Sequence, residues 1–293
     1  MTRGNCCIAY ESSSAASPAA KEVQNYIAGL RAVFSDVQES GLIRLNTILR
    51  VQEAVEQNNA GLRKLPGTLL KNRNTGATVY EPPQDALVIE HLMTELVKFI
   101  HADDGLDPLL RMAIAHHQFE SIHPFYDGNG RIGRILNLLI LQREDPLDLP
   151  VLYLSRYITS TKNQYYRLLQ STRKTHDWVE WCVYIVKGVA VTAKSEIKLV
   201  KNLSELMQST KQPLRSELPK LYRQKLLNNL FRYPHSKIEF VENDLGISRI
   251  TAAKYLDALD AHGFVQKKKI GRTNFYINAP LFNLLTQITL DDE

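Results

Sequence analysis

Apolar residues recur every three to four positions along most of the chain up to about residue 207. This is the spacing of amphipathic helices, in which one apolar face is directed to a core. It predicts helices over residues 21–37, 43–56, 87–100, 109–121, 162–172 and 177–207. A chain in which nearly all periodic segments are helical belongs to the mainly α class.

One stretch interrupts the helical pattern, residues 65–83, from Leu65 to Pro83. Residues 72–76 read Asn-Arg-Asn-Thr-Gly, a composition that favours a turn, and apolar pairs stand on both sides of it. We expect a β-hairpin here, with a plain surface loop as the alternative.

The pattern changes again after residue 211, where Pro213 and Pro219 indicate a linker. The sequence then predicts helices over 221–231 and 249–262, a further helix start at 238, and two short strands within 264–277. Ser248 is placed to cap the helix that follows it. This order of helix, turn, helix and hairpin resembles a winged helix.

We therefore divide the chain into a flexible segment over residues 1–20, a helical domain over 21–211 and a winged-helix-like domain over 212–293. Hydrophobic residues make up 44% and charged residues 23% of the chain, which is ordinary for a soluble protein with a core. Three cysteines, two of them adjacent, give neither a disulfide framework nor a zinc spacing. With no membrane-spanning run and no signal-peptide pattern, we expect a cytoplasmic protein in a reducing compartment.

The most informative stretch is residues 123–134, His-Pro-Phe-Tyr-Asp-Gly-Asn-Gly-Arg-Ile-Gly-Arg. Gly128, Asn129 and Gly130 can adopt positive φ, so that successive N–H groups point into one concavity that binds anions. A helix that we expect to start at Ile132 adds the positive end of its dipole at the same place.

Charged side chains complete this stretch. Arg131 and Arg134 are neighbours on the first helical turn, where their guanidinium groups can grip phosphate oxygens. Asp127 can hold a divalent cation that bridges those oxygens, and it can also act as a turn residue before glycine. His123 precedes the loop and is free to take a proton. These residues predict a nucleotide phosphate site with its own general base.

The pattern His-x-Phe-x-Asp-Gly-Asn-Gly-Arg-x-x-Arg, matched here at every fixed position, is similar to the signature of Fic-domain proteins. The resemblance covers roughly residues 21–200. It implies a mainly α fold, namely a Fic-type helical domain with a β-hairpin flap, followed in this chain by the small winged-helix domain. It implies that the nucleotide binds at Gly128, Asn129, Gly130, Arg131, Ile132, Gly133 and Arg134.

The resemblance also implies a reaction, AMPylation, in which AMP passes from ATP to a Ser, Thr or Tyr hydroxyl of a protein. His123 would be the general base, Asp127 would hold Mg²⁺, and Arg134 would contact the γ-phosphate. The hairpin from Leu65 to Pro83 would hold the target protein by strand addition. Self-modification and a homodimer are further expectations, and no membrane partner is expected.

Two aromatic and two histidine residues lie on predicted helices outside the motif. One of Tyr165 and Tyr166 stacks on adenine if the family pattern holds, and the distance from the motif favours Tyr165. His116 and His117 lie in mid-helix, with His117 directed away from the core face, so we expect a scaffold role or plain solvation.

Other functions are open at this stage. An enzyme of the same fold could transfer UMP, phosphocholine or phosphate, or remove AMP, although Gly130 favours nucleotide transfer over kinase-like relatives, which carry Lys there. The C-terminal domain could instead bind DNA as part of a transcription regulator. Residues 212–293 carry 12 Lys and Arg against 9 Asp and Glu, a modest excess for that role. A dead scaffold is disfavoured because every catalytic position is filled.

Many Fic proteins carry an inhibitory helix with the pattern Ser/Thr-x-x-x-Glu-Gly/Asn, whose glutamate pairs with the second arginine of the motif. We find no full match, because Ser40 follows residues 35–39 and Ile197 follows residues 192–196. We expect a truncated or variant N-terminus, an unmasked Arg134 and constitutive activity.

Overall fold

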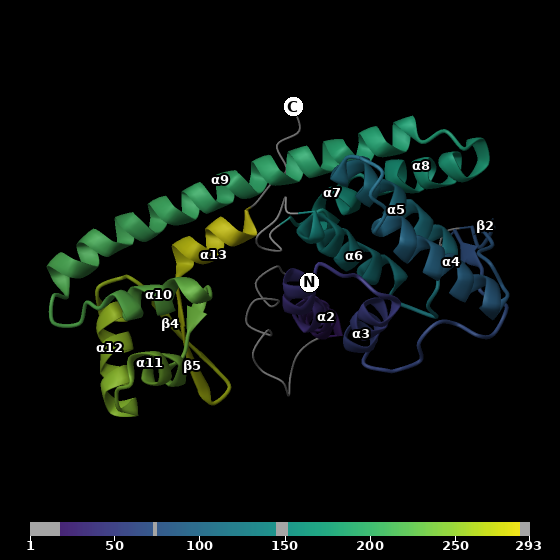
Figure 1. Cartoon of the computed structure of the whole chain (residues 1–293). Coiled ribbons are helices and arrows are strands. Elements are labelled where there is room, and N and C mark those ends of the chain that lie inside the picture. The colour runs from purple at the N-terminus through teal and green to yellow at the C-terminus, as the bar shows by residue number, and fades with distance from the viewer. Residues whose placement is uncertain (1–17, 73–74, 145–151, 288–293) are drawn as a thin grey trace. The chain divides into compact units, whose positions relative to one another are not determined.

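The computed structural model describes residues 18–72, 75–144 and 152–287 (Figure 1). The predicted flexible segment over residues 1–20 falls almost entirely outside these ranges. The described residues are mainly helical and form two compact units, one ending at Ala193 and one beginning at Lys194. The predicted fold class is confirmed by this helical content and by the hairpin described below.

The first unit is a helical bundle whose predicted helices are all present, with ends that differ by a few residues. They are α2 (Pro18–Ser40), α3 (Leu45–Glu56), α4 (Ala86–Ile100), α5 (Pro108–Ile122), α6 (Asn129–Arg143), α7 (Ser155–Ser160), α8 (Lys162–Thr175) and the first half of α9 (Val179–Glu217). Helix α5 packs against α4 and α6, while α2 packs against α3 and α6. The short helix α7 was not predicted.

The hairpin consists of β1 (Leu70–Lys71) and β2 (Thr78–Tyr80), which pair antiparallel. Leu70 pairs with Tyr80, and the register shifts by one residue before Lys71 pairs with Thr78. A two-stranded ribbon of this length needs support from the rest of the fold. The predicted β-hairpin is confirmed, and the alternative of a plain surface loop is wrong.

Helix α5 ends where the motif begins, and helix α6 begins within the motif. The Asp107 carboxylate accepts the Leu109 N–H at the start of α5, and Pro108 stands in the first turn, where it costs no hydrogen bond. His123 ends α5 in the left-handed conformation, with φ 49° and its N–H donating to the Phe119 carbonyl at 2.9 Å. Gly128 precedes α6, also left-handed. Residues 123–128, between these two helices, form the loop of the motif.

An aromatic cluster fills the interior behind α5. Trp181 is fully buried and donates its indole N–H to the Ala113 carbonyl at 2.7 Å. His116 stacks on Trp181, and His117 contacts it edge-on while facing the Leu169 carbonyl at 3.2 Å. Both histidines are buried, so the expectation that His117 points away from the core was wrong. Burial lowers the pKa of His116 to about 3 and that of His117 to about 4, so both are neutral scaffold residues.

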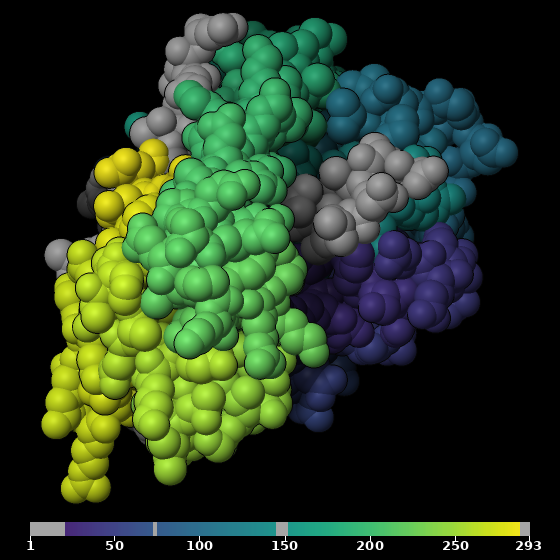
Figure 2. Space-filling view, turned by 90° about the vertical axis from the view of Figure 1, so that its left-hand side faces the viewer, coloured from purple at the N-terminus to yellow at the C-terminus, as the bar shows by residue number. Residues whose placement is uncertain are grey.

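The second unit contains the second half of α9 together with α10 (Gln224–Arg232), α11 (Ile238–Leu245), α12 (Arg249–Ala261) and α13 (Ala279–Thr286). Its sheet has the order β3-β5-β4, formed by His235–Ser236, Thr273–Ile277 and Gln266–Ile270. Helices α10, α11 and α12 and strands β4 and β5 lie close to where the sequence predicts them, whereas β3 and α13 were not predicted. Figure 2 shows the surface of this unit in light green and yellow. A core of its own includes Leu226, Leu256 and Tyr276.

Helix α9 differs from the prediction of a linker after residue 211. It continues to Glu217 with Pro213 inside it. Proline removes one helical hydrogen bond, a cost that packing must offset. Leu214, the next residue, is fully buried in the core of the second unit, and this burial favours the helical path. Among the described residues, no helix is both long enough and apolar enough to cross a membrane.

Candidate active site

His123 stands at the rim of the site with its side chain mostly buried. Its Nδ1 atom is buried without a hydrogen-bond partner in the described residues, which leaves Nε2 as the candidate base atom. Burial, together with the positive charges of Arg63 and Arg173, lowers the pKa of His123 to about 4, against weaker opposing effects of the Glu120 backbone and of Asp127. The imidazole is therefore neutral at pH 7, as a general base has to be.

Arg63 holds this histidine in place, and sequence reasoning missed it. Its side chain is fully buried, and Nε donates to the His123 carbonyl at 2.8 Å while Nη2 donates to the carbonyls of Pro83 and Ile122. Its own backbone N–H donates to the Pro124 carbonyl at 2.8 Å. One guanidinium thus joins the end of α5, the motif loop and the end of the hairpin segment. These partners lie about 20 and 60 residues away in sequence, so no local signal indicates the contact.

The anion-binding loop differs in detail from the prediction. Of the three residues predicted to have a positive φ, only Gly128 has one, 76°, and Asn129 and Gly130 already belong to α6. The predicted run of left-handed residues was therefore wrong, and the helix begins three residues before Ile132. The Asn129 side chain closes the loop by accepting the Phe125 N–H at 2.9 Å and donating to the Phe125 carbonyl at 2.8 Å.

What remains of the predicted concavity is a helix N-terminus. The N–H groups of Arg131 and Ile132 both turn back to the Gly128 carbonyl, at 2.9 and 3.0 Å. No side chain caps the helix. In the described part of the chain, the first two amides of α6 have no acceptor, so they and the helix dipole favour an anion here.

A carboxylate of the same chain lies at this helix N-terminus. The Glu56 Oε1 atom would be 2.1 Å from a Cβ added to Gly128, and it accepts from Arg131 Nη2 at 2.7 Å. Glu22 makes a looser contact with the other nitrogen, Nη1, at 3.2 Å. Burial raises the pKa of Glu56, against the effect of Arg131. The first arginine of the motif, Arg131, is therefore paired with a carboxylate. The inhibitory pattern sought in the sequence concerns the second arginine, Arg134, only.

Arg134, the second arginine, lies deeper in the unit. Its Nη1 atom is 3.2 Å from the position of a Cβ at Gly130, and its Nε atom is buried without a hydrogen-bond partner among the described residues. Glu120 lies close to it, buried, with an Oε1 atom that has no hydrogen-bond partner among the described residues. Burial raises the pKa of Glu120 to about 6, while Arg134 and Arg173 oppose this shift. No carboxylate forms an ion pair with Arg134 within the described ranges.

Asp127 is exposed at the mouth of the loop and accepts the Gly128 N–H with Oδ1 at 2.7 Å. The turn role is thus met with one oxygen, and Oδ2 remains for another ligand. A single carboxylate fits Mg²⁺, which keeps waters and uses substrate phosphates as its other ligands. Within the described ranges, no group of three or more His, Cys, Asp and Glu could hold a metal ion.

The two candidate tyrosines have different environments. Tyr165 is buried against Trp181 and donates or accepts a hydrogen bond with His116 Nε2 at 3.0 Å, so its ring faces are taken. Tyr166 is 52% exposed, with Lys162 above its ring. The preference for Tyr165 is corrected on this ground, because the aromatic core behind α5 takes up its ring. Of the two tyrosines, only Tyr166 has an exposed ring on which the adenine of a nucleotide could stack.

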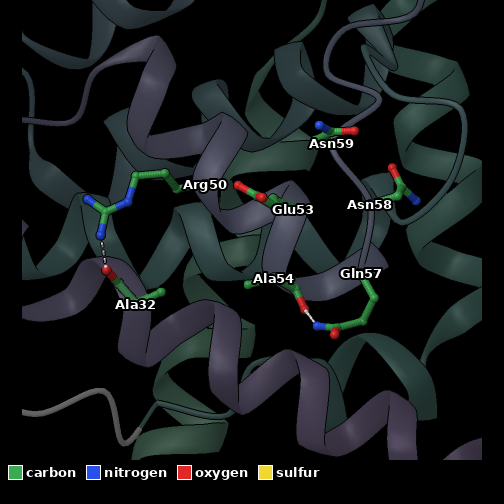
Figure 3. A pocket seen from close by; sticks show the side chains of 7 residues that line it. All are labelled: Ala32, Arg50, Glu53, Ala54, Gln57, Asn58 and Asn59. Atoms are coloured by element: carbon green, nitrogen blue, oxygen red, sulfur yellow. Dashed lines mark hydrogen bonds between the residues drawn. The ribbon is translucent and has the colours of Figure 1, made fainter.

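A surface depression between α2 and α3 holds none of the motif residues (Figure 3). It is lined by Ala32, Arg50, Glu53, Ala54, Gln57, Asn58 and Asn59. Arg50 donates to the Ala32 carbonyl at 2.6 Å, and Gln57 donates to the Ala54 carbonyl at 2.6 Å. Its polar groups thus serve the helices themselves, and we assign it no function.

The basic strand of the second unit is partly neutralised. Lys267 pairs with Asp257 at 2.6 Å and lies near the Tyr276 ring, and its N–H donates to Asp260. Two aspartates of α12, Asp257 and Asp260, therefore face this strand. Lys268 and Lys269 remain exposed. This pattern gives no support to a nucleic-acid interface.

Known proteins share both parts of the chain. The sequence profile of the Fic/DOC family matches residues 37–141, and that of "Protein adenylyltransferase SoFic-like, C-terminal domain" matches residues 206–281. A probable protein adenylyltransferase of Aquifex aeolicus is 34% identical over 87 residues, which is 30% of this chain and 27% of that protein. Protein adenylyltransferase fic-1 of Caenorhabditis elegans is 38% identical over 85 residues, 28% of this chain and 16% of that protein. The chain thus matches only about a quarter or less of these relatives.

Solved structures share the fold. A Fic family protein from Desulfovibrio desulfuricans superposes with a TM-score of 0.57 at 19% identity, covering 94% of this chain and 81% of that one. A Fic domain-containing signaling protein from Bacteroides thetaiotaomicron gives a TM-score of 0.51 at 19% identity, covering 68% and 81%. The chain thus carries a Fic/DOC domain over residues 37–141 and a region over residues 206–281 that matches the SoFic-like C-terminal domain, and the solved structures share its fold.

Proposed function

We propose that this chain transfers AMP from ATP to a hydroxyl group of a protein. One observation carries the proposal: a neutral histidine, His123, precedes an uncapped helix N-terminus, where the Glu56 carboxylate lies against Gly128 and pairs with Arg131. A site that holds one anion suits another, and phosphate is the anion for which two arginines and free amides are matched. The names of the Aquifex and Caenorhabditis relatives agree with this activity.

The chemistry follows from these positions. The acceptor hydroxyl gives its proton to Nε2 of His123 as its oxygen attacks the α-phosphorus of ATP. The bond from the α-phosphorus to the bridging oxygen breaks, and pyrophosphate leaves with that oxygen. Arg131, Arg134 and the first amides of α6 stabilise the negative charge on the phosphate oxygens, the main source of catalysis in phosphoryl transfer. The Glu56 side chain has to leave the helix N-terminus before the phosphates enter.

Asp127 would hold a magnesium ion through Oδ2. Bound there, the ion would neutralise charge on the phosphates and fix their geometry. The acceptor segment would lie along the hairpin β1–β2, whose free strand edge offers backbone hydrogen bonds to an extended peptide. The exposed side chains of Leu65, Leu69 and Val79 give this edge an apolar surface for that segment.

Two labelled forms of ATP test the proposal. The protein is incubated with a cell lysate and Mg²⁺, together with ATP labelled with ³²P at the α- or the γ-phosphate. Relative to the same lysate without the chain, we expect additional label on protein, including on the chain itself, from the α-form only. Label from the γ-form would indicate phosphate transfer, and label from α-labelled UTP in preference to ATP would indicate UMP transfer. No protein label from any of these donors would contradict nucleotide transfer.

A further inference from the structure

Arg173 lies on α8, outside the motif, yet it contacts the last turn of α5 just before His123. Its Nε atom donates to the Ser121 hydroxyl at 2.8 Å, and its Nη2 atom donates to the Glu120 carbonyl at 2.8 Å. The remaining nitrogen, Nη1, is buried without a hydrogen-bond partner among the described residues. A planar guanidinium that donates from two edges fixes its own orientation, which a lysine cannot do.

The flat face of the same guanidinium contacts the hairpin. Its central carbon is 3.7 Å from the centre of the Tyr80 ring, and Tyr80 is the last residue of β2. The Tyr80 hydroxyl donates to the Ser121 carbonyl at 2.9 Å. Strand β2, helix α8 and the end of α5 are thus joined in a closed set of three contacts. Because the two-stranded hairpin is too short to be stable alone, these contacts fix the end of the hairpin that lies away from its turn, where Tyr80 pairs with Leu70.

The charge of Arg173 also faces the catalytic groups. It lies near the buried Glu120 carboxylate, whose other neighbour is Arg134, and it is one of the positive charges beside His123. The other charged groups facing His123 are Arg63 from the segment after α3 and Asp127 from the motif loop. Arg173 therefore stands between the hairpin on one side and the base on the other.

We infer that Arg173 is a positioning residue that holds strand β2 against the end of α5, so that the acceptor segment lies at a fixed distance from His123. The inference rests on the proposed function, because it concerns an acceptor bound at the hairpin. A second effect follows from its charge: Arg173 disfavours the protonated form of His123 and so adds to the effects of burial and of Arg63.

Three variants separate these effects. Arg173→Met removes the charge and the donors but keeps a long side chain, Arg173→Lys keeps the charge and loses the planar contact, and Tyr80→Phe keeps the ring contact and loses the hydroxyl bond. The matched control is Arg167→Met on the same helix. Arg167 is exposed, and its ion pair with Glu180 is loose, with 3.7 Å between the nitrogen and the oxygen.

Two measurements on the whole chain need no substrate. Hydrogen exchange reports the stability of β2, and we expect the amides of residues 78–80 to exchange at least tenfold faster in Arg173→Met and in Arg173→Lys, with α3 unchanged. Titration of the His123 imidazole by NMR should show its pKa rising toward the ordinary value in Arg173→Met and staying low in Arg173→Lys. The Arg167 variant should change neither. Unchanged exchange and titration in a folded Arg173→Met protein would overturn the inference.

Labelling then connects the contacts to the reaction. With α-³²P-ATP and a lysate, Arg173→Met should label protein at least tenfold more slowly, while its Kd for ATP stays within twofold of the original. A fall in ATP affinity equal to the fall in rate would contradict a role at the acceptor side. If the unmodified chain transfers no label at all, the proposed function fails. The exchange and titration results still decide whether Arg173 holds the hairpin.

Discussion

Replacement of Glu56 gives the sharpest test of how the nucleotide site is filled. In the structure, its carboxylate lies against Gly128 and pairs with Arg131, where a phosphate has to bind. Glu56→Ala removes the competing acid without cutting the helix, because Glu56 is the last residue of α3. A carboxylate at a helix C-terminus opposes the helix dipole, and its removal offsets part of the stability that is lost with the Arg131 contact.

The magnitude follows from the burial of the pair. The side chains of Arg131 and Glu56 are 20% and 13% exposed, and the contact is a charge-assisted hydrogen bond of 2.7 Å. Such bonds contribute about 1.5–3 kcal/mol, and partial exposure favours the lower end. Opening this contact before ATP binds therefore lowers the affinity by roughly tenfold, since 1.4 kcal/mol corresponds to a factor of ten. Glu22 is 55% exposed and adds little.

Isothermal titration with Mg-ATP measures this effect. We expect Glu56→Ala to bind ATP about tenfold more tightly and to be modified faster, whereas Glu56→Gln gains less because its amide still lies near Gly128. Glu53→Ala is the matched control, since Glu53 lies on the same helix, lines the open depression and touches no motif residue (Figure 3). Weaker binding by Glu56→Ala would refute the reasoning and show that Glu56 holds Arg131 in place for the nucleotide.

Three further changes have defined outcomes. Gly128→Ala should destabilise the protein by about 1–2 kcal/mol and abolish ATP binding, because φ is 76° and the new Cβ meets Glu56; thermal unfolding and titration measure both. Arg63→Met should lower the free energy of unfolding by roughly 3 kcal/mol or more in urea, because it leaves buried carbonyls unpaired. The rate of labelling at saturating Mg-ATP should hold as pH falls through 6.5 and decline only as His123 protonates near 4, since a base with a lowered pKa stays neutral above that value.

Each of these outcomes has a control and a contradiction. The double variant of Gly128→Ala with Glu56→Ala should relieve the clash but keep the backbone strain, so full recovery of stability would contradict the strain. Arg31→Met on the exposed face of α2 should leave urea unfolding unchanged, and an equal loss there would remove the special role of Arg63. An acid limb at pH 6.5 would show that His123 is not kept neutral by its surroundings.

The sequence predicts what is local in this protein. Helical spacing indicates the bundle, Asp107 and Pro108 indicate the start of α5, and the motif itself indicates a phosphate loop because its residues are consecutive. Even there, the start of α6 was placed three residues late. The helix begins inside the glycine-rich run, since only Gly128 needs the left-handed conformation.

The rest depends on contacts between distant segments. Arg63 reaches His123 across 60 residues, Arg131 reaches Glu56 across 75, and Arg173 reaches Ser121 across 52. A single sequence shows nothing that pairs these positions. The burial of Tyr165 was not predicted for the same reason, because its ring packs against Trp181 from another helix.

The central claim is that His123 is the base of a nucleotide transfer, and intact-protein mass spectrometry after incubation with Mg-ATP tests it most directly. The assay compares the original chain with His123→Ala and with His91→Ala, an exposed histidine on α4. We predict adducts of one AMP with the original chain and with His91→Ala. His123→Ala should form none although it still binds ATP. AMP adducts formed by His123→Ala at the original rate would contradict the claim.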